Sequence, residues 1–282
     1  MRCLFASDLH GRVDRYDKLF RRAREERPDV VLLGGDLLPS LGSPSVPRDD
    51  FIEEVIGEAV HELERELGPR APTFLIILGN DDPLSQEDVL LEGARRGLWR
   101  YLHDRRVDLR SHTFVGYAHV PPSPFLHKDW ERYDVSQFVD VGCVSPEEGY
   151  RSTPVSDRDL RYHTMARNID RLAAGVDDAT AVWLFHAPPY ESKLDRAALD
   201  GVRYEHVPVD VHVGSIAIQR FVRERQPLVT LHGHVHESAR LTGDWRDRLG
   251  RTHMFSAAHD GPELALVRFD LNDLDGATRE LI

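Results

Sequence analysis

The sequence is poor in cysteine and in long apolar runs. Its 282 residues include two cysteines, Cys3 and Cys143, which are too few for a disulfide framework and indicate a reducing compartment. The chain has no run of about 18 apolar residues that would predict a transmembrane helix, and its first apolar run, residues 3–6, is too short for a signal peptide. These absences predict a cytoplasmic protein that does not insert into a membrane.

Positive charge is also scarce, because 36 Lys and Arg residues stand against 48 Asp and Glu, for a formal net charge of −12. General binders of nucleic acids or membrane surfaces rely on clustered positive charge, so the balance argues against both classes. The length suffices for one large domain with a sizeable core, and we expect residues 1–282 to form a single domain. Histidine, by contrast, is plentiful, with 15 residues.

Five short apolar runs predict strands that are buried on both faces. Apolar residues at helical spacing between them predict two helices, one at residues 13–27 and one at 51–63, the latter capped by Asp49 or Asp50. This alternation predicts a right-handed parallel core whose strand ends gather at one edge, where open α/β sheets bind ligands. The five runs are residues 3–6, 30–33, 74–78, 181–185 and 227–231.

The second half of the chain is less regular. Residues 115–120, 254–257 and 264–270 predict further strands, and therefore a second, mixed sheet. Residues 121–165 are rich in Pro, Arg and Asp, and they predict an irregular excursion over the site. Within this excursion we expect a surface loop in which Trp130 is buried.

Each of the five apolar runs is followed by side chains that bind metals. Residues two apart in a strand-ending loop can point the same way, so Asp8 with His10 and His234 with His236 each offer two ligands from one place. Imidazole, carboxylate and amide donors without a thiolate suit Mn²⁺, Fe²⁺, Zn²⁺ or Ni²⁺. A glycine precedes Asp36, Asn80 and His234, at turns that a Cβ would obstruct. The five motifs are Asp8-Leu9-His10, Gly35-Asp36, Gly79-Asn80-Asp81-Asp82, His186 and Gly233-His234-Val235-His236.

In this order the motifs resemble those of the calcineurin-like metallophosphoesterases, over residues 3–270, and are most similar to the small bacterial and archaeal phosphoesterases. The resemblance implies an α/β fold, a four-layer αββα sandwich of two mixed sheets flanked by helices, with two divalent transition-metal ions at the strand ends. We expect Mn²⁺, with Fe²⁺, Zn²⁺ or Ni²⁺ as alternatives. The implied ligands are Asp8, His10, Asp36 and His236 for the first metal, and Asp36, Asn80, His186 and His234 for the second, with Asp36 bridging.

The resemblance also implies a mechanism in which two metals lower the pKa of a shared water and neutralise charge on the phosphoryl oxygens. One residue departs from the pattern, since Asp81 stands directly after Gly79-Asn80, where many members have a histidine. An ionised carboxylate is a poor general acid unless its surroundings raise its pKa. The departure favours phosphodiesters or activated esters over phosphoproteins, and we expect Asp82 to orient a ligand.

A replacement for the missing histidine can be sought among His112, His119, His212 and His259. The sequence favours His212, because the stretch from His212 to Ser215 opens a predicted helix at residues 216–224. A helix N-terminus binds phosphate, and Ser215 is a suitable cap. The alternative is a solvent-facing histidine before an ordinary capped helix. We also place His119 on the substrate side.

The expected function is therefore that of a phosphodiesterase acting on small or nucleotide-like phosphate esters. The acidic balance disfavours nucleic-acid polymers as substrates, because tracking several phosphates needs a basic groove. Two alternatives stay open. One is a phosphomonoesterase, including a protein Ser/Thr phosphatase, and the other is a catalytically weak scaffold of the same fold.

Overall fold

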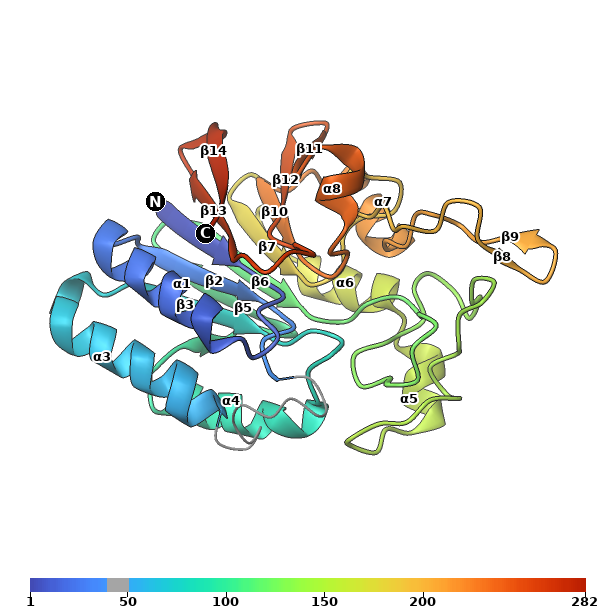
Figure 1. Ribbon diagram of the computed structural model, residues 1–282, viewed down its shortest axis with the longest axis horizontal. Coiled ribbons are helices and arrows are strands. Elements are labelled where there is room, and N and C mark those ends of the chain that lie inside the picture. The colour runs from blue at the N-terminus through green and yellow to red at the C-terminus, as the bar shows by residue number, and fades with distance from the viewer. Residues whose placement is uncertain (40–50) are drawn as a thin grey trace.

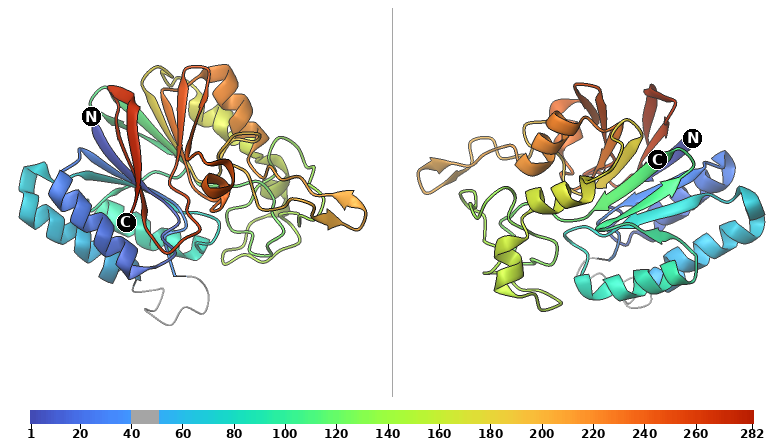
Figure 2. Two further views of the ribbon diagram at one scale, coloured as in Figure 1. Left: turned by 45° about the horizontal axis from the view of Figure 1, so that its top comes forward. Right: turned by 180° about the vertical axis from the view of Figure 1, so that it is seen from behind.

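The computed structural model describes residues 1–39 and 51–282, and it contains two six-stranded mixed sheets packed face to face (Figure 1). Helices cover the outer face of each sheet, so the chain forms an α/β sandwich, as predicted. Figure 2 shows the blue and cyan helices of the first hundred residues on one side of the sandwich and the yellow and orange helices on the other.

The first sheet has the strand order β14-β13-β1-β2-β3-β4. Its three central strands, β1, β2 and β3, are parallel and correspond to the first three predicted runs. β13 pairs antiparallel with β1, which makes the sheet mixed. The strands are β1 (Arg2–Ala6), β2 (Val30–Gly34), β3 (Thr73–Ile77), β4 (Arg100–Tyr101), β13 (Ala265–Asp270) and β14 (Asp273–Leu281).

The second sheet has the order β11-β12-β10-β7-β6-β5. Four of its strands are mutually parallel, whereas β5 and β11 run antiparallel at the two edges. The strand predicted at residues 115–120 begins three residues earlier, because pairing with β7 already starts at Thr113 beside Ala181. The strands are β5 (Arg105–Leu109), β6 (His112–Tyr117), β7 (Ala181–Phe185), β10 (Val229–His232), β11 (Arg246–Leu249) and β12 (Thr252–Ser256).

Two apolar clusters hold the layers together. The larger fills the space between the two sheets and beneath the helices of the first half, and the smaller lies between the second sheet and α6 and α7. No helix of the described residues combines the length and apolar character needed to cross a bilayer. The helices are α1 (Val13–Glu26), α3 (Glu58–Leu67), which continues a π-helical stretch at Ile52–Gly57, α4 (Glu87–Arg95), α5 (Asp157–Tyr162), α6 (Met165–Ala173), α7 (Ile216–Arg225) and α8 (Ser238–Thr242).

Several elements escaped sequence analysis because they lack an apolar run. The edge strand β5 has the sequence Arg-Arg-Val-Asp-Leu and shows one face to solvent. A short hairpin of β8 (Arg203–Tyr204) and β9 (Val207–Pro208) projects from the body of the molecule (Figure 1). The predicted helix cap at Asp49 or Asp50 lies outside the described residues.

Residues 121–156 contain no helix or strand, but the centre of this excursion is not a surface loop. Lys128, Asp129 and Glu131 are buried together with Trp130, so the expectation of a surface loop around the tryptophan was wrong. The physical reason is an internal ion pair, in which Lys128 Nζ lies 2.5 Å from Glu131 Oε2 and 2.8 Å from the carbonyl oxygen of Ser123. Two charges that neutralise one another can be buried together.

This ion pair generates a stability prediction. Lys128→Met leaves the Glu131 carboxylate buried without its cation, and we expect the free energy of unfolding in urea to fall by about 3 kcal/mol. Adding Glu131→Gln should restore most of the loss, because it removes the unpaired charge. The matched change Lys193→Met, in an exposed pair with Asp244, should leave stability nearly unchanged. Equal effects of the two lysine changes would contradict a buried pair.

Candidate metal centre

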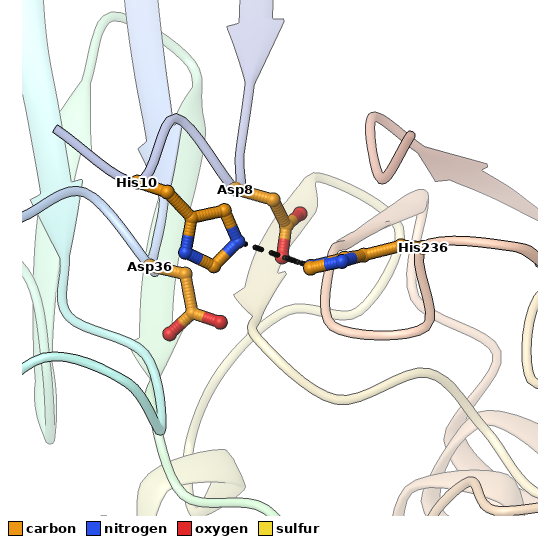
Figure 3. Close-up of side chains that lie close together, drawn as sticks. All are labelled: Asp8, His10, Asp36 and His236. Carbon is orange, nitrogen blue, oxygen red and sulfur yellow. Dashed lines mark hydrogen bonds and ion pairs between the residues drawn. The ribbon is translucent and has the colours of Figure 1, made fainter. Parts of the chain in front are cut away.

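The seven predicted ligand residues follow strands that end along one edge of the sandwich, and four of them converge on one point. In the first group, one ligand atom from each of Asp8, His10, Asp36 and His236 lies within 4.8 Å of the others (Figure 3). The Nε2 atoms of His10 and His236 approach to 3.2 Å, and His236 Nε2 lies 3.2 Å from Asp8 Oδ1. Three donor atoms that converge in this way suit a single cation.

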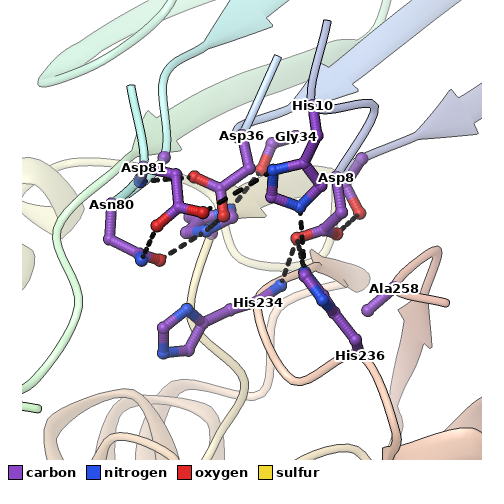
Figure 4. Close-up of polar contacts among 12 residues, drawn as sticks. Asp8, His10, Gly34, Asp36, Asn80, Asp81, His234, His236 and Ala258 are labelled. Carbon is purple, nitrogen blue, oxygen red and sulfur yellow. Dashed lines mark hydrogen bonds and ion pairs between the residues drawn. The ribbon is translucent and has the colours of Figure 1, made fainter. Parts of the chain in front are cut away.

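The second group consists of Asn80, His186 and His234 beside Asp36, and Figure 4 shows Asn80 close to Asp36. His186 Nε2 lies 3.0 Å from Asn80 Oδ1 and 3.3 Å from Asp36 Oδ2, and the ring centroids of His186 and His234 are 5.2 Å apart. His186 Nδ1 contacts the carbonyl oxygen of Gly34 at 2.8 Å. Because a carbonyl only accepts, Nδ1 donates and Nε2 is the atom presented to the centre.

Four of these residues have a backbone conformation that residues other than glycine rarely adopt. Asp8, His10, Asp36 and His234 have φ values of 56°, 49°, 52° and 73°, in the left-handed region. Each costs about 1 kcal/mol relative to ordinary backbone. Backbone hydrogen bonds hold the turns, from Asp8 N to Gly35 O at 2.9 Å and from His10 N to Asp36 O at 2.8 Å. Strain of this kind concentrates where a site requires it.

The glycines before the ligand residues have no room for a side chain, which confirms the prediction made for them. A Cβ at Gly79 would lie 2.3 Å from Asp36 Oδ1, and one at Gly233 would lie 2.6 Å from Asp8 Oδ2. At Gly35 the contact would be 2.6 Å from His186 Nδ1. The three glycines therefore let the strand-end loops approach the ligand side chains directly.

Charges within the centre shift the pKa values of its groups strongly. Burial alone would raise the pKa of Asp36, but the charge and hydrogen bond of His186 lower it to about 2. Burial would likewise lower the pKa of His186, yet Asp36 raises it to about 10, and Asp8 acts on His236 to raise its pKa to about 9. Burial and the charge of His186 lower the pKa of His234 to about 3. The metal-free centre thus balances its carboxylates with imidazolium protons.

Asp82 ties two strand-end loops together rather than facing the centre. Its fully buried carboxylate accepts hydrogen bonds from the backbone N–H groups of Leu37 at 3.0 Å, Leu38 at 2.8 Å and Gly79 at 2.9 Å. Burial and the charge of Asp36 raise its pKa to about 7, against the lowering effect of the three hydrogen bonds. Asp82 therefore fixes the loops that carry Asp36 and Asn80, as expected of a residue that orients ligands.

Asp81 lies at the rim of the centre, with 47 % of its side chain exposed. Its backbone N–H donates to Asp36 Oδ1 at 2.8 Å, and its Oδ1 accepts from Asn80 Nδ2 at 2.9 Å. Its Oδ2 lies 3.6 Å from His10 Nδ1. The charge of Asp36, followed by burial, raises the pKa of Asp81, which is the direction that a proton donor needs.

The structure corrects the predicted phosphate site at the start of α7. Ser215 caps the helix as predicted, accepting from Ile218 N at 3.1 Å, but its side chain is fully buried and donates to Asp134 Oδ1 at 2.6 Å. The backbone N–H groups of Ile216 and Ala217 also donate to Asp134. An internal carboxylate therefore fills the place that a phosphate would take, so Ser215 does not bind substrate there.

The other histidines proposed from sequence lie apart from the seven ligand residues. His212 Nδ1 bonds to Asp195 Oδ1 at 2.8 Å, and within the described chain no hydrogen bond or ion pair joins His212 to the ligands. The ring of His119 packs against His103, Tyr117 and Trp130, and its place on the substrate side stays a prediction. His112 lies at the beginning of β6, opposite the ligand-bearing strand ends, and His259 Nε2 contacts Glu263.

Two residues that support the centre were missed by sequence analysis. Arg15 is buried on α1 and donates to the backbone carbonyls of Asp8 and Gly261 at 2.5 and 2.6 Å. Trp130 donates from Nε1 to the carbonyl oxygen of Asp82 at 2.8 Å, which docks the excursion on the Asn80 loop. The position of Arg15 on the apolar face of the predicted helix was a sequence signal that it is buried. The residues next to Trp130 in the sequence, by contrast, do not predict its hydrogen-bond partner.

A comparison with protein families decides the assignment. Residues 1–238 match the family model described as calcineurin-like phosphoesterase. The chain belongs to this family. The calcineurin-like family is dinuclear and metal-dependent, and the cluster at Asp8, His10, Asp36 and His236 has the donor atoms to hold a metal ion. No curated protein sequence matches the chain.

Solved structures share the calcineurin-like fold at low sequence identity. The protein TT1561 of Thermus thermophilus has a TM-score of 0.57 at 15% identity, covering 99% of this chain and 98% of that one. A dimetal phosphatase from Danio rerio has a TM-score of 0.52 at 13% identity, with coverages of 95% and 91%. Phosphopantetheinyl hydrolase from Mycobacterium tuberculosis has a TM-score of 0.51 at 15% identity, with coverages of 91% and 89%. These similarities support the fold.

The raised pKa values of His186 and His236 predict that metal binding releases protons. Both lie above neutrality in the metal-free protein, at about 10 and about 9, whereas a metal takes a neutral imidazole. We expect about two protons to be released per centre near pH 7.5, and Mn²⁺ affinity to rise as the pH increases from 7 towards 10. Titration calorimetry in buffers of different ionisation enthalpy measures the number. A binding enthalpy that is independent of buffer would contradict it.

The close approach at Gly79 generates a second prediction. Gly79→Ala forces the Asp36 carboxylate and the Asn80 loop apart, and we expect Mn²⁺ affinity to fall at least about tenfold, because small displacements of ligands weaken metal binding strongly. Gly57→Ala is the matched control, since its nearest atom would lie at 3.4 Å. Wild-type Mn²⁺ affinity in Gly79→Ala would show that the Asp36 side chain relaxes freely.

Proposed function

We propose that this protein is a two-metal phosphodiesterase that hydrolyses small or nucleotide-like phosphodiesters. Membership of the calcineurin-like family supports phosphoester hydrolysis, and the donor set of the centre supports metal dependence. The observation that carries the choice of a diester is Asp81, a carboxylate at the rim that contacts Asn80 and lies 3.6 Å from His10.

The preference for a diester follows from charge. A phosphomonoester carries up to two negative charges near neutrality, whereas a diester carries one. Bound metal ions would neutralise the carboxylates of Asp8 and Asp36, whereas Asp81 lies at the rim and is not among the proposed ligands. In its ionised form Asp81 repels a dianion more strongly than a monoanion.

In the proposed centre Asp8, His10, Asp36 and His236 hold one metal ion, and Asn80, His186 and His234 join Asp36 around the other. When bound, two divalent ions supply water activation and neutralise charge on the phosphoryl group. Asp36 would contribute its carboxylate as an anion, since its pKa is lowered to about 2 in the metal-free centre. The hydrogen bond from His186 to Gly34 keeps Nε2 directed at the centre. We propose Mn²⁺ as the metal, on the basis of the mixed nitrogen and oxygen donors.

Proton transfer to the leaving group is assigned to Asp81 rather than to His212. Asp81 contacts the centre and its pKa is raised, whereas His212 is oriented by the buried Asp195 and forms no hydrogen bond or ion pair with the described ligand residues. The raised pKa increases the share of protonated Asp81, and in that form it is placed to give a proton at the edge from which the leaving group departs. His212 serves as the comparison in the experiment below.

Activity with added Mn²⁺ tests this function. We expect kcat/KM for bis-p-nitrophenyl phosphate to exceed that for p-nitrophenyl phosphate at least about tenfold, and phosphopeptides to be poorer still. Asp36→Asn should lower kcat at least about a thousandfold, because it removes the bridging charge. Dominant turnover of phosphopeptides would instead establish a protein phosphatase, and protein that binds no Mn²⁺ would indicate a scaffold.

The role of Asp81 is tested by varying the leaving group. Asp81→Asn should lower kcat about 10- to 100-fold for a diester with a poor leaving group such as an alkyl alcohol, and much less for p-nitrophenol, which needs no proton. His212→Asn is the control and should leave both rates nearly unchanged. A selective loss in His212→Asn would transfer the role to that residue.

A further inference from the structure

A cavity of about 310 Å³ is lined by residues of the excursion and bordered by the end of β6, by α5 and by α6. None of the seven metal-ligand residues, all of them in the described part of the chain, lines it. The lining is polar and aromatic, and it includes His103, Tyr117, His119, Arg132 and Asn168. Cavities of this size accommodate small organic ligands.

Arg132 supplies a buried positive charge to this cavity. Arg132 is 9% exposed. Among the described residues its guanidinium makes one hydrogen bond, from Nη1 to the carbonyl oxygen of Glu131 at 3.1 Å. Within residues 1–39 and 51–282 it forms no ion pair with a carboxylate. An arginine stays charged even when burial lowers its pKa, so this cation lacks a direct anionic partner.

His119 lines the same cavity. The residue is 7% exposed, and in the described structure its Nδ1 is buried without a partner. Leaving such an atom unpaired costs about 1–3 kcal/mol. Its ring stacks on His103 at a centroid distance of 4.9 Å and an interplanar angle of 20°.

The remaining charged groups of the lining are already compensated or lie in solvent. Arg171 is ion-paired with Asp104. Asp159 accepts from Ser156 Oγ at 2.7 Å and has 58% of its side chain exposed, next to the exposed His163. Asp159 and Asp129 act on Arg132 at longer range, but within the described residues no carboxylate forms an ion pair with it, so a bound negative charge would be its first direct partner.

We propose that this cavity binds a small organic oxyanion, a carboxylate or a phosphate ester, whose charged group contacts Arg132 and His119. The aromatic walls formed by His103 and Tyr117 suit a flat ring attached to that group. The site is separate from the metal centre and holds whether or not the centre hydrolyses phosphodiesters.

Calorimetric titration of the Mn²⁺-loaded protein with benzoate and phenylphosphonate tests the proposal, with benzyl alcohol as the neutral probe. We expect at least one of the anions to bind and benzyl alcohol to bind at least tenfold more weakly. The tighter anion identifies the headgroup as carboxylate or phosphate. Arg132→Gln should weaken binding at least tenfold, Arg132→Lys less, and Arg21→Gln, on the exposed face of α1, not at all.

Two further results separate this site from the metal centre. Asp36→Asn should leave binding in the cavity unchanged, whereas an anion bound by the metals would lose affinity. A crystal of the wild-type protein soaked in benzoate tests the same claim without any substitution. Benzoate in contact with Arg132 supports the proposal. It is overturned by benzoate only at the metals, by no bound benzoate or phenylphosphonate at millimolar concentration, or by unchanged affinity in a folded Arg132→Gln variant.

Discussion

The candidate centre depends on one buried carboxylate that binds no metal in the proposed arrangement. Asp82 accepts three backbone hydrogen bonds from the loops that follow β2 and β3, and those loops carry Asp36 and Asn80. Burying a carboxylate costs solvation free energy, which only charged partners or several hydrogen-bond donors can offset. Here the donors belong to the two loops, so the hydrogen bonds that stabilise the Asp82 carboxylate also fix the geometry of the centre.

The rest of the centre follows from how closely the strand ends approach one another. Glycine at positions 35, 79 and 233 lets backbone contact the ligand side chains, and left-handed backbone at Asp8, His10, Asp36 and His234 turns those side chains inwards. In the metal-free protein, the raised pKa values of His186 and His236 favour their protonated forms, whose positive charge balances the neighbouring carboxylates. The fold therefore holds the ligand geometry through charge balance before any metal binds.

Features that depend on local pattern could be predicted from the sequence. The central strands appear as apolar runs, and each of the seven proposed ligand residues follows such a run. Contacts with partners distant in sequence could not be predicted. Ser215 was correctly identified as a cap, but the carboxylate that fills the helix terminus comes from Asp134, 81 residues earlier. Lys128 was expected in a surface loop, because its spacing from Glu131 does not reveal that both are covered by other segments. The polar edge strands carry no apolar signal at all.

The excursion shows a different consequence of the hydrogen bond between Trp130 and Asp82. A segment without regular secondary structure is usually free to vary in length and sequence during evolution. Residues 128–131 are instead part of the interior, and Asp129 Oδ2 accepts from Leu84 N at 2.7 Å beside the tryptophan contact. Insertions or deletions in the excursion can therefore be accommodated near the exposed residues Phe125 and Phe138. They cannot be accommodated at residues 128–131, which pack against the loop that carries Asn80.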